Sequence, residues 1–450
     1  MDILRGIIGL GALVGIAWLL SENRKAINWR TVGVGIGFQI LIGALILFKH
    51  PFENIIQVED IFTWIGEQFV HLVDFTKYGV NFLFASFVTG ELEVPLVNFA
   101  FTVLPIIIFF SALTSLLYYL GILQKMVYAF AWLMKRLMGI SGAESMSAAG
   151  NIFLGQTESP LLVRPYLEKM TRSEMMCLMT GGMATIAGSV LATYIMFLGD
   201  GDLAKSALFA KHLLIASVMS APAAIVAAKL IVPETENFNE EFSIPKEKLG
   251  TNVLEAISVG TTDGLKLAVN VGAMLLVFIA LMYCGNWILD LGGLVPVGSD
   301  IVMLEEDETI VIDNNLNYLI AAHTDYDGLS MQFILGYSLA PVAWLIGVPS
   351  EDIFLVGQLL GEKTVINEFV AYTTLTTMKS EGMFANEKSI IMSTYILCGF
   401  ANFSSIGIQI GGIGALVPNR RGLLSQLGVK ALIGGTLACL FTAVIVGMMI

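Results

Sequence analysis

A run of polar side chains interrupts an otherwise apolar sequence between residues 151 and 165. Gln156, Thr157 and Glu158 place an amide, a hydroxyl and a carboxylate in adjacent positions, between Gly155 and Pro160. Glycine and proline both discourage a continuous straight helix, so the run predicts a break in the chain. Such polar groups are costly in a membrane unless they line a cavity, and we therefore interpret this run as a functional site.

The second half of the chain carries a matching set of polar residues. Glu368 lies between two short apolar arms, and Asn402 and Ser405 interrupt a later apolar segment beside Phe400. Together with the first run they offer carboxylates, amides and hydroxyls but no fixed cation, which suits a neutral, hydroxyl-rich solute with an aromatic part. The alternative for the two glutamates is a pair of buried acids bonded to helix ends. For Asn402 and Ser405 the alternative is that their side chains hydrogen-bond the backbone groups that an ordinary helix break leaves unpaired.

A cation site is a further hypothesis. Asn151 and Thr185 are short oxygen donors near two predicted helix breaks, the second of which lies in the glycine-rich stretch 181–188. Unwound backbone carbonyls at such breaks complete the ligand shell of a cation in many transporters.

Composition determines the class of protein that positions these groups. Of 450 residues, 56% are hydrophobic and only 14% are charged, and several apolar runs reach the ~20 residues that a membrane-spanning helix needs. We expect an all-α polytopic membrane protein with eight transmembrane helices, at about 3–20, 31–49, 95–121, 173–198, 207–232, 265–290, 389–415 and 428–450. Interfacial helices are expected within 50–87, 124–138 and 332–346, and a small exposed β-hairpin at 301–312.

The two halves of the chain resemble each other. Residues 142–167 (hairpin 1) and 350–377 (hairpin 2) each hold two apolar arms too short to cross a bilayer, which predicts re-entrant hairpins, and each is followed by a helix with a polar or glycine-rich interruption. Seven of the eight arginines fall in loops on one predicted side, which the positive-inside rule makes cytoplasmic, leaving both termini outside. The hairpins then open from opposite faces, an inverted repeat typical of secondary transporters.

This repeat predicts a division of the chain into scaffold and moving parts. We expect residues 1–121 to form scaffold helices with an interfacial helix, 122–232 the first half of a transport domain, 233–327 a linker with a scaffold helix and an outer loop, and 328–450 the second half of the transport domain.

Three motifs resemble those of the concentrative nucleoside transporter family. They are Gly155-Gln-Thr-Glu-Ser-Pro-Leu161, Ile366-Asn-Glu-Phe-Val-Ala-Tyr372 and Cys398-Gly-Phe-Ala-Asn-Phe-Ser-Ser-Ile-Gly-Ile-Gln-Ile-Gly411. The resemblance implies a homotrimer that binds a nucleoside through Gln156, Thr157, Glu158, Val190, Glu368, Phe400, Asn402 and Ser405. It also implies a sodium ion held by the side chains of Asn151 and Thr185 and the carbonyls of Leu154 and Ile186.

We therefore expect a sodium-coupled nucleoside symporter of the bacterial inner membrane, which carries a solute such as uridine or adenosine and is not an enzyme. Its partners would be the nucleoside, sodium and the lipid bilayer, and no nucleic acid. A proton-coupled nucleoside carrier is the alternative from the same class, and an intramembrane enzyme with paired carboxylates the alternative from another.

Overall fold

The computed structural model describes residues 2–47, 58–88, 104–199, 202–237, 251–297, 301–305, 308–312, 315–324 and 326–450. The start of the third predicted spanning helix, part of the predicted interfacial segment 50–87 and most of the linker after Pro233 lie outside these ranges.

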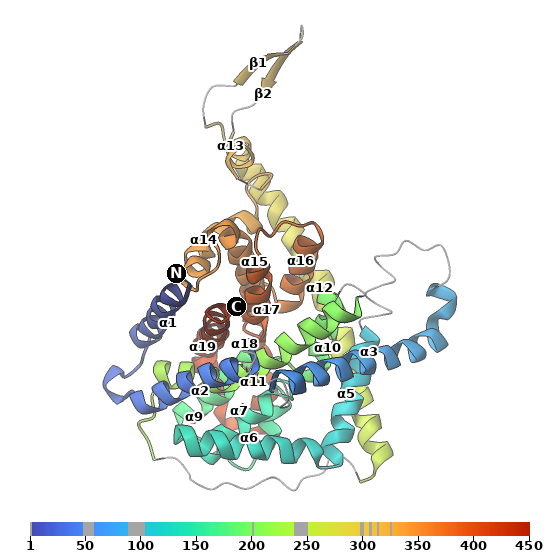
Figure 1. Ribbon diagram of the computed structural model, residues 1–450, viewed down its shortest axis with the longest axis vertical. Helices are drawn as coiled ribbons and strands as arrows, with labels where there is room; N and C mark the ends of the chain where they lie inside the picture. Colours follow the sequence, from blue (N-terminus) through green and yellow to red (C-terminus); the bar gives the residue numbers. More distant parts are fainter. Residues whose placement is uncertain are drawn as a thin grey trace.

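In its described residues, the first half of the chain forms helices joined by turns and irregular segments, with no strand (Figure 1). Its α-helices are α1 (Asp2–Leu19), α2 (Trp29–Leu47), α3 (Val58–Val88), α5 (Leu104–Tyr119), α6 (Ile122–Met138), α7 (Gly142–Asn151), α8 (Ser159–Leu162), α9 (Arg172–Ala184), α10 (Gly188–Gly199) and α11 (Leu203–Ile231).

The second half adds one pair of strands to a further set of helices. Its elements are α12 (Val253–Gly293), β1 (Ile301–Glu305), β2 (Glu308–Ile312), α13 (Leu316–His323), α14 (Met331–Leu345), α15 (Ile353–Val365), α16 (Glu368–Ser380), α17 (Glu387–Leu397), α18 (Phe403–Leu416) and α19 (Arg421–Gly447). Short 3₁₀ helices lie at Arg24–Ala26, Ser350–Asp352 and Pro418–Arg420.

Most of the predicted elements are confirmed. The strands β1 and β2 pair antiparallel with Ile301 opposite Ile312, and they form the predicted hairpin at one end of the molecule (Figure 1). Two predictions were incomplete: α12 is a single helix of 41 residues that begins twelve residues before the predicted helix at 265–290, and α13 was not foreseen.

Within the described ranges, four helical segments are long and apolar enough to cross a membrane, namely α2, the α9–α10 pair, α11 and α19 with its preceding turn. The α5–α6 pair makes a fifth if its 76° bend is counted within one span. Gly121, with φ of +75°, provides this bend because a left-handed conformation ends α5 and redirects α6. The described residues thus do not establish eight spans.

Local sequence signals explain where the site-forming elements begin. Ser141 and Thr171 start α7 and α9 with capping boxes, in which Glu144 and Glu174 complete the reciprocal hydrogen bonds.

Two breaks follow the hairpins: break 1, residues 185–187 between α9 and α10, and break 2, residues 398–402 between α17 and α18.

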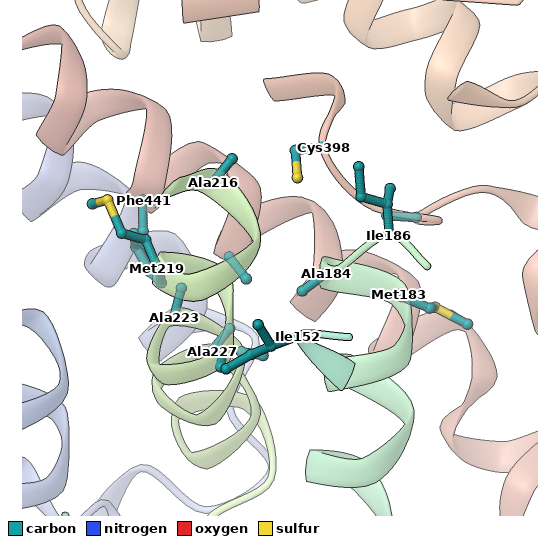
Figure 2. Packing of buried hydrophobic residues seen from close by; sticks show 14 of the residues in the cluster. Ile152, Met183, Ala184, Ile186, Ala216, Met219, Ala223, Ala227, Cys398 and Phe441 are labelled. Atoms are coloured by element: carbon teal, nitrogen blue, oxygen red, sulfur yellow. The ribbon is translucent and has the colours of Figure 1, made fainter. Parts of the chain in front are cut away.

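Helix α11 forms the centre of the apolar core. Its Ser217 lies against Ile152, at the end of hairpin 1's first helix, and both side chains are buried in the apolar region that Figure 2 shows. Small residues allow such close helix contact, and Ser217 Oγ adds a 2.8 Å hydrogen bond to the Ile152 carbonyl. This packing fixes hairpin 1 against α11. Elsewhere α5 packs along α12, α14 against α15 and α1 against α19.

Candidate functional site

The tip of hairpin 1 meets the second broken helix through three polar side chains. Gln156 Nε2 donates to Ser405 Oγ at 3.2 Å, and Gln409 Nε2 donates to Gln156 Oε1 at 3.2 Å and to the Met179 carbonyl at 3.0 Å. Gln156 is 8% exposed and Ser405 and Gln409 are almost fully buried. Residues from the two halves of the sequence therefore share one hydrogen-bond network, as predicted for Gln156 and Ser405.

Hairpin 2 reaches the same broken helix through Glu368. This residue begins α16, after the N-cap Asn367, and its carboxylate accepts hydrogen bonds from Asn402 Nδ2 at 2.9 Å and from the Tyr194 hydroxyl at 3.2 Å. Asn402 in turn caps α18, its Oδ1 accepting from Ser405 N at 2.9 Å. A helix N-terminus favours a carboxylate, so the position of Glu368 follows from the local fold.

Break 2 touches the end of α9, immediately before break 1, at Gly399. Its φ is +139°, and a Cβ added there would lie 2.7 Å from the Met183 carbonyl oxygen and 2.8 Å from the Ala184 carbonyl carbon. Only glycine allows both the conformation and the contact. Figure 2 shows the neighbouring Cys398 beside Ala184 and Ile186 of the first broken helix. The polar groups of both repeats are thereby held in one region.

Glu158 lies apart from the second-half polar groups. Its carboxylate accepts a 2.8 Å hydrogen bond from Gly155 N within hairpin 1, and the side chain lines a cavity of about 280 Å³. The cavity is also bordered by Phe153 and Ser189, by Arg164, and by α5 and α12, where Asp263 is the acidic member. Such a volume is close to the lower end of small-ligand pockets.

The remaining predicted substrate residues lie around this network. Thr157 is exposed, and a Cβ added at Gly412 would lie 3.0 Å from its Cγ2, which places it beside α18. Phe400 lies half-buried in break 2. Val190 is 1% exposed in the first turn of α10.

The predicted cation ligands gather around break 1. Asn151 ends α7 and lies against Gly181, where an added Cβ would be 2.7 Å from Asn151 Nδ2. Its Oδ1 accepts from Ser159 Oγ at 2.6 Å, whereas its buried Nδ2 has no hydrogen-bond partner among the described residues. Thr185 Oγ1 donates to the Gly181 carbonyl at 2.9 Å, which leaves its lone pairs available.

The backbone brings the tip of hairpin 1 to the same break. Gly188 N donates to the Phe153 carbonyl at 3.2 Å, which joins the end of break 1 to the turn that contains Leu154. Leu154 and Ile186 are both buried. The four predicted cation ligands therefore belong to two segments in direct contact.

Sequence reasoning missed two members of the site, Gln409 and Tyr194. Helical spacing contained the signal for both. Gln409 lies four residues after Ser405, and Tyr194 four residues after Val190, so each shares a helix face with a predicted residue.

Comparison with known proteins gives the family. Residues 212–447 match the C-terminal model of the Na⁺ dependent nucleoside transporters, residues 8–87 match the N-terminal model, and residues 100–201 match a nucleoside-recognition "Gate" model. The chain belongs to this family. The family is one of transporters, which agrees with the prediction of a protein that is not an enzyme.

Full-length relatives and solved structures agree with this assignment. An uncharacterized transporter of Haemophilus influenzae is 39% identical over 100% of this chain and 98% of its own length. Sodium/nucleoside cotransporter 1 of Rattus norvegicus is 41% identical over 95% of this chain, which spans 61% of that relative.

Among solved structures, CNTnw in an inward-facing substrate-bound state is 36% identical, with a TM-score of 0.82, and covers 100% of this chain and 99% of its own. A CNTnw variant in an outward-facing state gives 0.83 at 35% identity, covering 100% of this chain and 98% of its own. The fold is therefore that of the CNT structures, and the match is equally good in both states.

Proposed function

We propose that this protein imports nucleosides across the bacterial inner membrane by sodium symport with alternating access. The observation that carries the proposal is the convergence of Gln156 and Glu368, from two different hairpins, on Ser405 and Asn402 of one broken helix. Membership of a Na⁺ dependent nucleoside transporter family supports the substrate class.

Substrate binding would exchange internal hydrogen bonds for bonds to the nucleoside. Glu368, Asn402 and Ser405 now bond to one another or to Gln156, and ribose hydroxyls can both donate to the carboxylate and accept from the amide. In this proposal Gln156, Thr157, Glu158 and Val190 contact the base, and Phe400 lines the pocket. The cavity beside Glu158 supplies a route between hairpin 1 and helices α5 and α12.

Sodium would be carried as a co-substrate at break 1. Helix α9 ends there at Ala184, and the C-terminal carbonyls of a helix carry a partial negative charge that favours a cation. Asn151 and Thr185 would add side-chain oxygens to the carbonyls of Leu154 and Ile186. Moving one charge inward contributes about 2.3 kcal/mol per 100 mV of membrane potential, besides the ion gradient.

The proposed arrangement in the membrane keeps eight spans, two opposed re-entrant hairpins, external termini and a homotrimer, with the division into scaffold and transport ranges given above. Basic residues at one end support the orientation. There Arg172 and Lys430 both pair with Glu22, and Arg420 donates to the carbonyls of Glu168 and Met170.

Uptake of radiolabelled uridine and adenosine into proteoliposomes tests the proposal. We expect uptake that depends on an inward sodium gradient and falls to background when choline replaces sodium. Uptake that persists in choline but requires a proton gradient would favour the proton-coupled alternative. Recovery of a chemically altered nucleoside would favour the enzyme alternative, and no uptake of either nucleoside would overturn the proposal.

A further inference from the structure

The two hairpins place different groups against the broken helices behind them. In hairpin 2, Lys363 lies in the last turn of α15 with no exposed surface. Its Nζ donates to the Ile396 carbonyl at 2.7 Å and contacts Cys439 Sγ at 3.3 Å. Because Ile396 is the penultimate residue of α17, the ammonium lies at the C-terminal end of the first half of a broken helix.

Hairpin 1 presents a neutral side chain in the corresponding place. Asn151 also occupies the last turn of its hairpin's first helix, is also fully buried, and lies against Gly181 in the last turn of α9. Asn151 lies one residue after Gly150 and seven before Glu158, and Lys363 lies two residues after Gly361 and five before Glu368. Where the second repeat has an ammonium, the first has an amide.

A buried ammonium is costly unless negative charge compensates it. For Lys363 the compensation comes from the α17 C-terminus, which carries roughly half a negative charge, and from the nearby Glu368, with which it interacts electrostatically. Among the described residues, its two direct contacts are a carbonyl and a thiol rather than a carboxylate. Lys363 therefore places its charge directly on a helix end, and it acts on the Glu368 carboxylate only at longer range, without a conventional ion pair.

Cys439 fixes this arrangement from a third helix. Its thiol donates to the Cys398 carbonyl at 2.8 Å, in break 2, while its sulfur contacts Lys363. The ammonium is thus held against both the end of α17 and the start of break 2.

We propose that Lys363 is a positioning residue whose ammonium group serves as a permanent cation beside break 2. In the first repeat, the corresponding place beside break 1 would instead bind an exchangeable cation. Break 2 then stays ordered and Glu368 stays charge-balanced throughout transport, whereas break 1 changes charge with each cycle. The part of this inference that concerns the mobile cation rests on the proposed function.

Chemical rescue tests the proposal. Lys363→Ala removes the ammonium and leaves a space for a small amine, and Lys363→Met replaces it by a neutral chain of similar length. We expect uridine uptake by both variants to fall about tenfold or more, because the buried Ile396 carbonyl at the end of α17 loses the ammonium that compensates it. Ethylammonium chloride should restore uptake by Lys363→Ala at least about threefold, because its NH₃⁺ can donate to the Ile396 carbonyl. Tetramethylammonium cannot donate and should not restore uptake.

Lys379→Met is the matched control. Lys379 also donates to the carbonyl of a penultimate helix residue, Leu198 of α10, but that helix end lies outside both breaks. We expect this variant to keep uptake within about threefold of the unmodified protein, as for the loss of one ordinary hydrogen bond, and to show no response to ethylammonium.

Thermal unfolding in detergent gives a second readout that does not need transport. Ethylammonium should raise the melting temperature of Lys363→Ala relative to tetramethylammonium and leave that of the unmodified protein unchanged. Near-normal uptake by folded Lys363→Met would overturn the proposal, as would a folded Lys363→Ala that ethylammonium neither reactivates nor stabilises. Failure of both variants to assemble even with ethylammonium would also overturn it, since Lys363 would then serve folding alone. Absence of nucleoside uptake by the unmodified protein would instead count against the proposed function, and the melting experiment would still report on Lys363.

Discussion

Hairpin 1 and hairpin 2 use similar sequences to make two different environments. The second helix of hairpin 1, α8, has only 4 residues, whereas its counterpart α16 has 13. Glu158 consequently turns back to Gly155 N beside a cavity, while Glu368 lies at the N-terminus of a full helix and is 4% exposed. The long helix α16 holds the Glu368 carboxylate at its N-terminus, whereas the short helix α8 leaves the Glu158 carboxylate beside the cavity.

The two breaks differ in the same sense. Break 2 ends at the N-cap Asn402, whose Oδ1 accepts from Ser405 N and whose amide donates to Glu368. Break 1 begins at Thr185, whose hydroxyl donates to the Gly181 carbonyl of α9, and faces the buried Asn151 amide, whose Nδ2 has no partner in the part of the chain that the structure describes. At break 2 the capping amide and the Glu368 carboxylate satisfy one another, whereas at break 1 the Asn151 Nδ2 has no partner among the described residues.

The largest expected loss of uptake comes from replacing Glu368 in hairpin 2. Glu368→Ala should reduce uridine uptake more than about a hundredfold, or about 2.7 kcal/mol, because it removes the acceptor of two buried donors. Uptake and the amount of inserted protein would be measured on the same membranes, with Glu381→Ala, at an exposed glutamate after α16, as the control. Uptake close to normal would remove Glu368 from the site.

A second prediction concerns Asn151 in hairpin 1. Asn151→Ala should raise the sodium concentration for half-maximal uptake about tenfold or more, the cost of one lost oxygen ligand of about 1.4 kcal/mol. Sodium titrations at saturating uridine measure this. Ser159→Ala is the control, because it removes the hydroxyl that bonds Asn151 and keeps the amide. An equal shift in both variants would assign the effect to that hydrogen bond rather than to ion binding.

The contact between the repeats should produce a smaller effect. Gln409→Ala removes the donor that orients Gln156, and we expect the KM for uridine to rise about fivefold to tenfold with little change in maximal rate, as for a net loss of about 1 kcal/mol. Gln426→Ala, an exposed glutamine on α19, serves as the control. An unchanged KM would mean that Gln156 is positioned without Gln409.

The smallest expected effect concerns the ion pairs of Glu22 with Arg172 and Lys430. Hydrogen bonds and charges from Arg172 and Lys430 lower the pKa of the Glu22 carboxyl from 4.5 to about 2. Because the folded-state pKa is the lower one, the stabilisation is full above about pH 4.5 and is lost as pH falls toward 2. Glu22→Gln should therefore cost less than about 1 kcal/mol at pH 7, since the pair is partly exposed.

Thermal unfolding in detergent at pH 7, 5 and 4 measures this effect. The difference between Glu22→Gln and the unmodified protein should be largest at pH 7 and shrink at pH 4. Glu236→Gln, an exposed glutamate beyond α11, is the control. A difference independent of pH would show that the carboxylate charge is not what stabilises this end.

Much of the site could be predicted because polar residues in apolar segments are conspicuous. Gln156, Glu368, Asn402 and Ser405 were predicted in this way, and the structure brings each into the network. Gln409 and Tyr194 were missed because they lie within ordinary helices: their spacing puts each on the same helix face as a predicted residue, but it does not show which partner approaches that face. The length of α12 was missed because Asp263 and Lys266 resemble a loop in a hydropathy pattern but lie on one continuous helix.

The sequence by itself determined the class of protein, the positions of the breaks and the family, because these depend on local composition and on motifs. The tertiary structure alone decided which groups meet. Gly399 brings break 2 against the end of α9 through a contact between residues more than two hundred positions apart, and no local pattern encodes such a distance. The same holds for Lys363: its sequence context resembles that of an ordinary helix-end lysine, and only the packing of α15 against α17 and α19 shows that its charge is buried at a break.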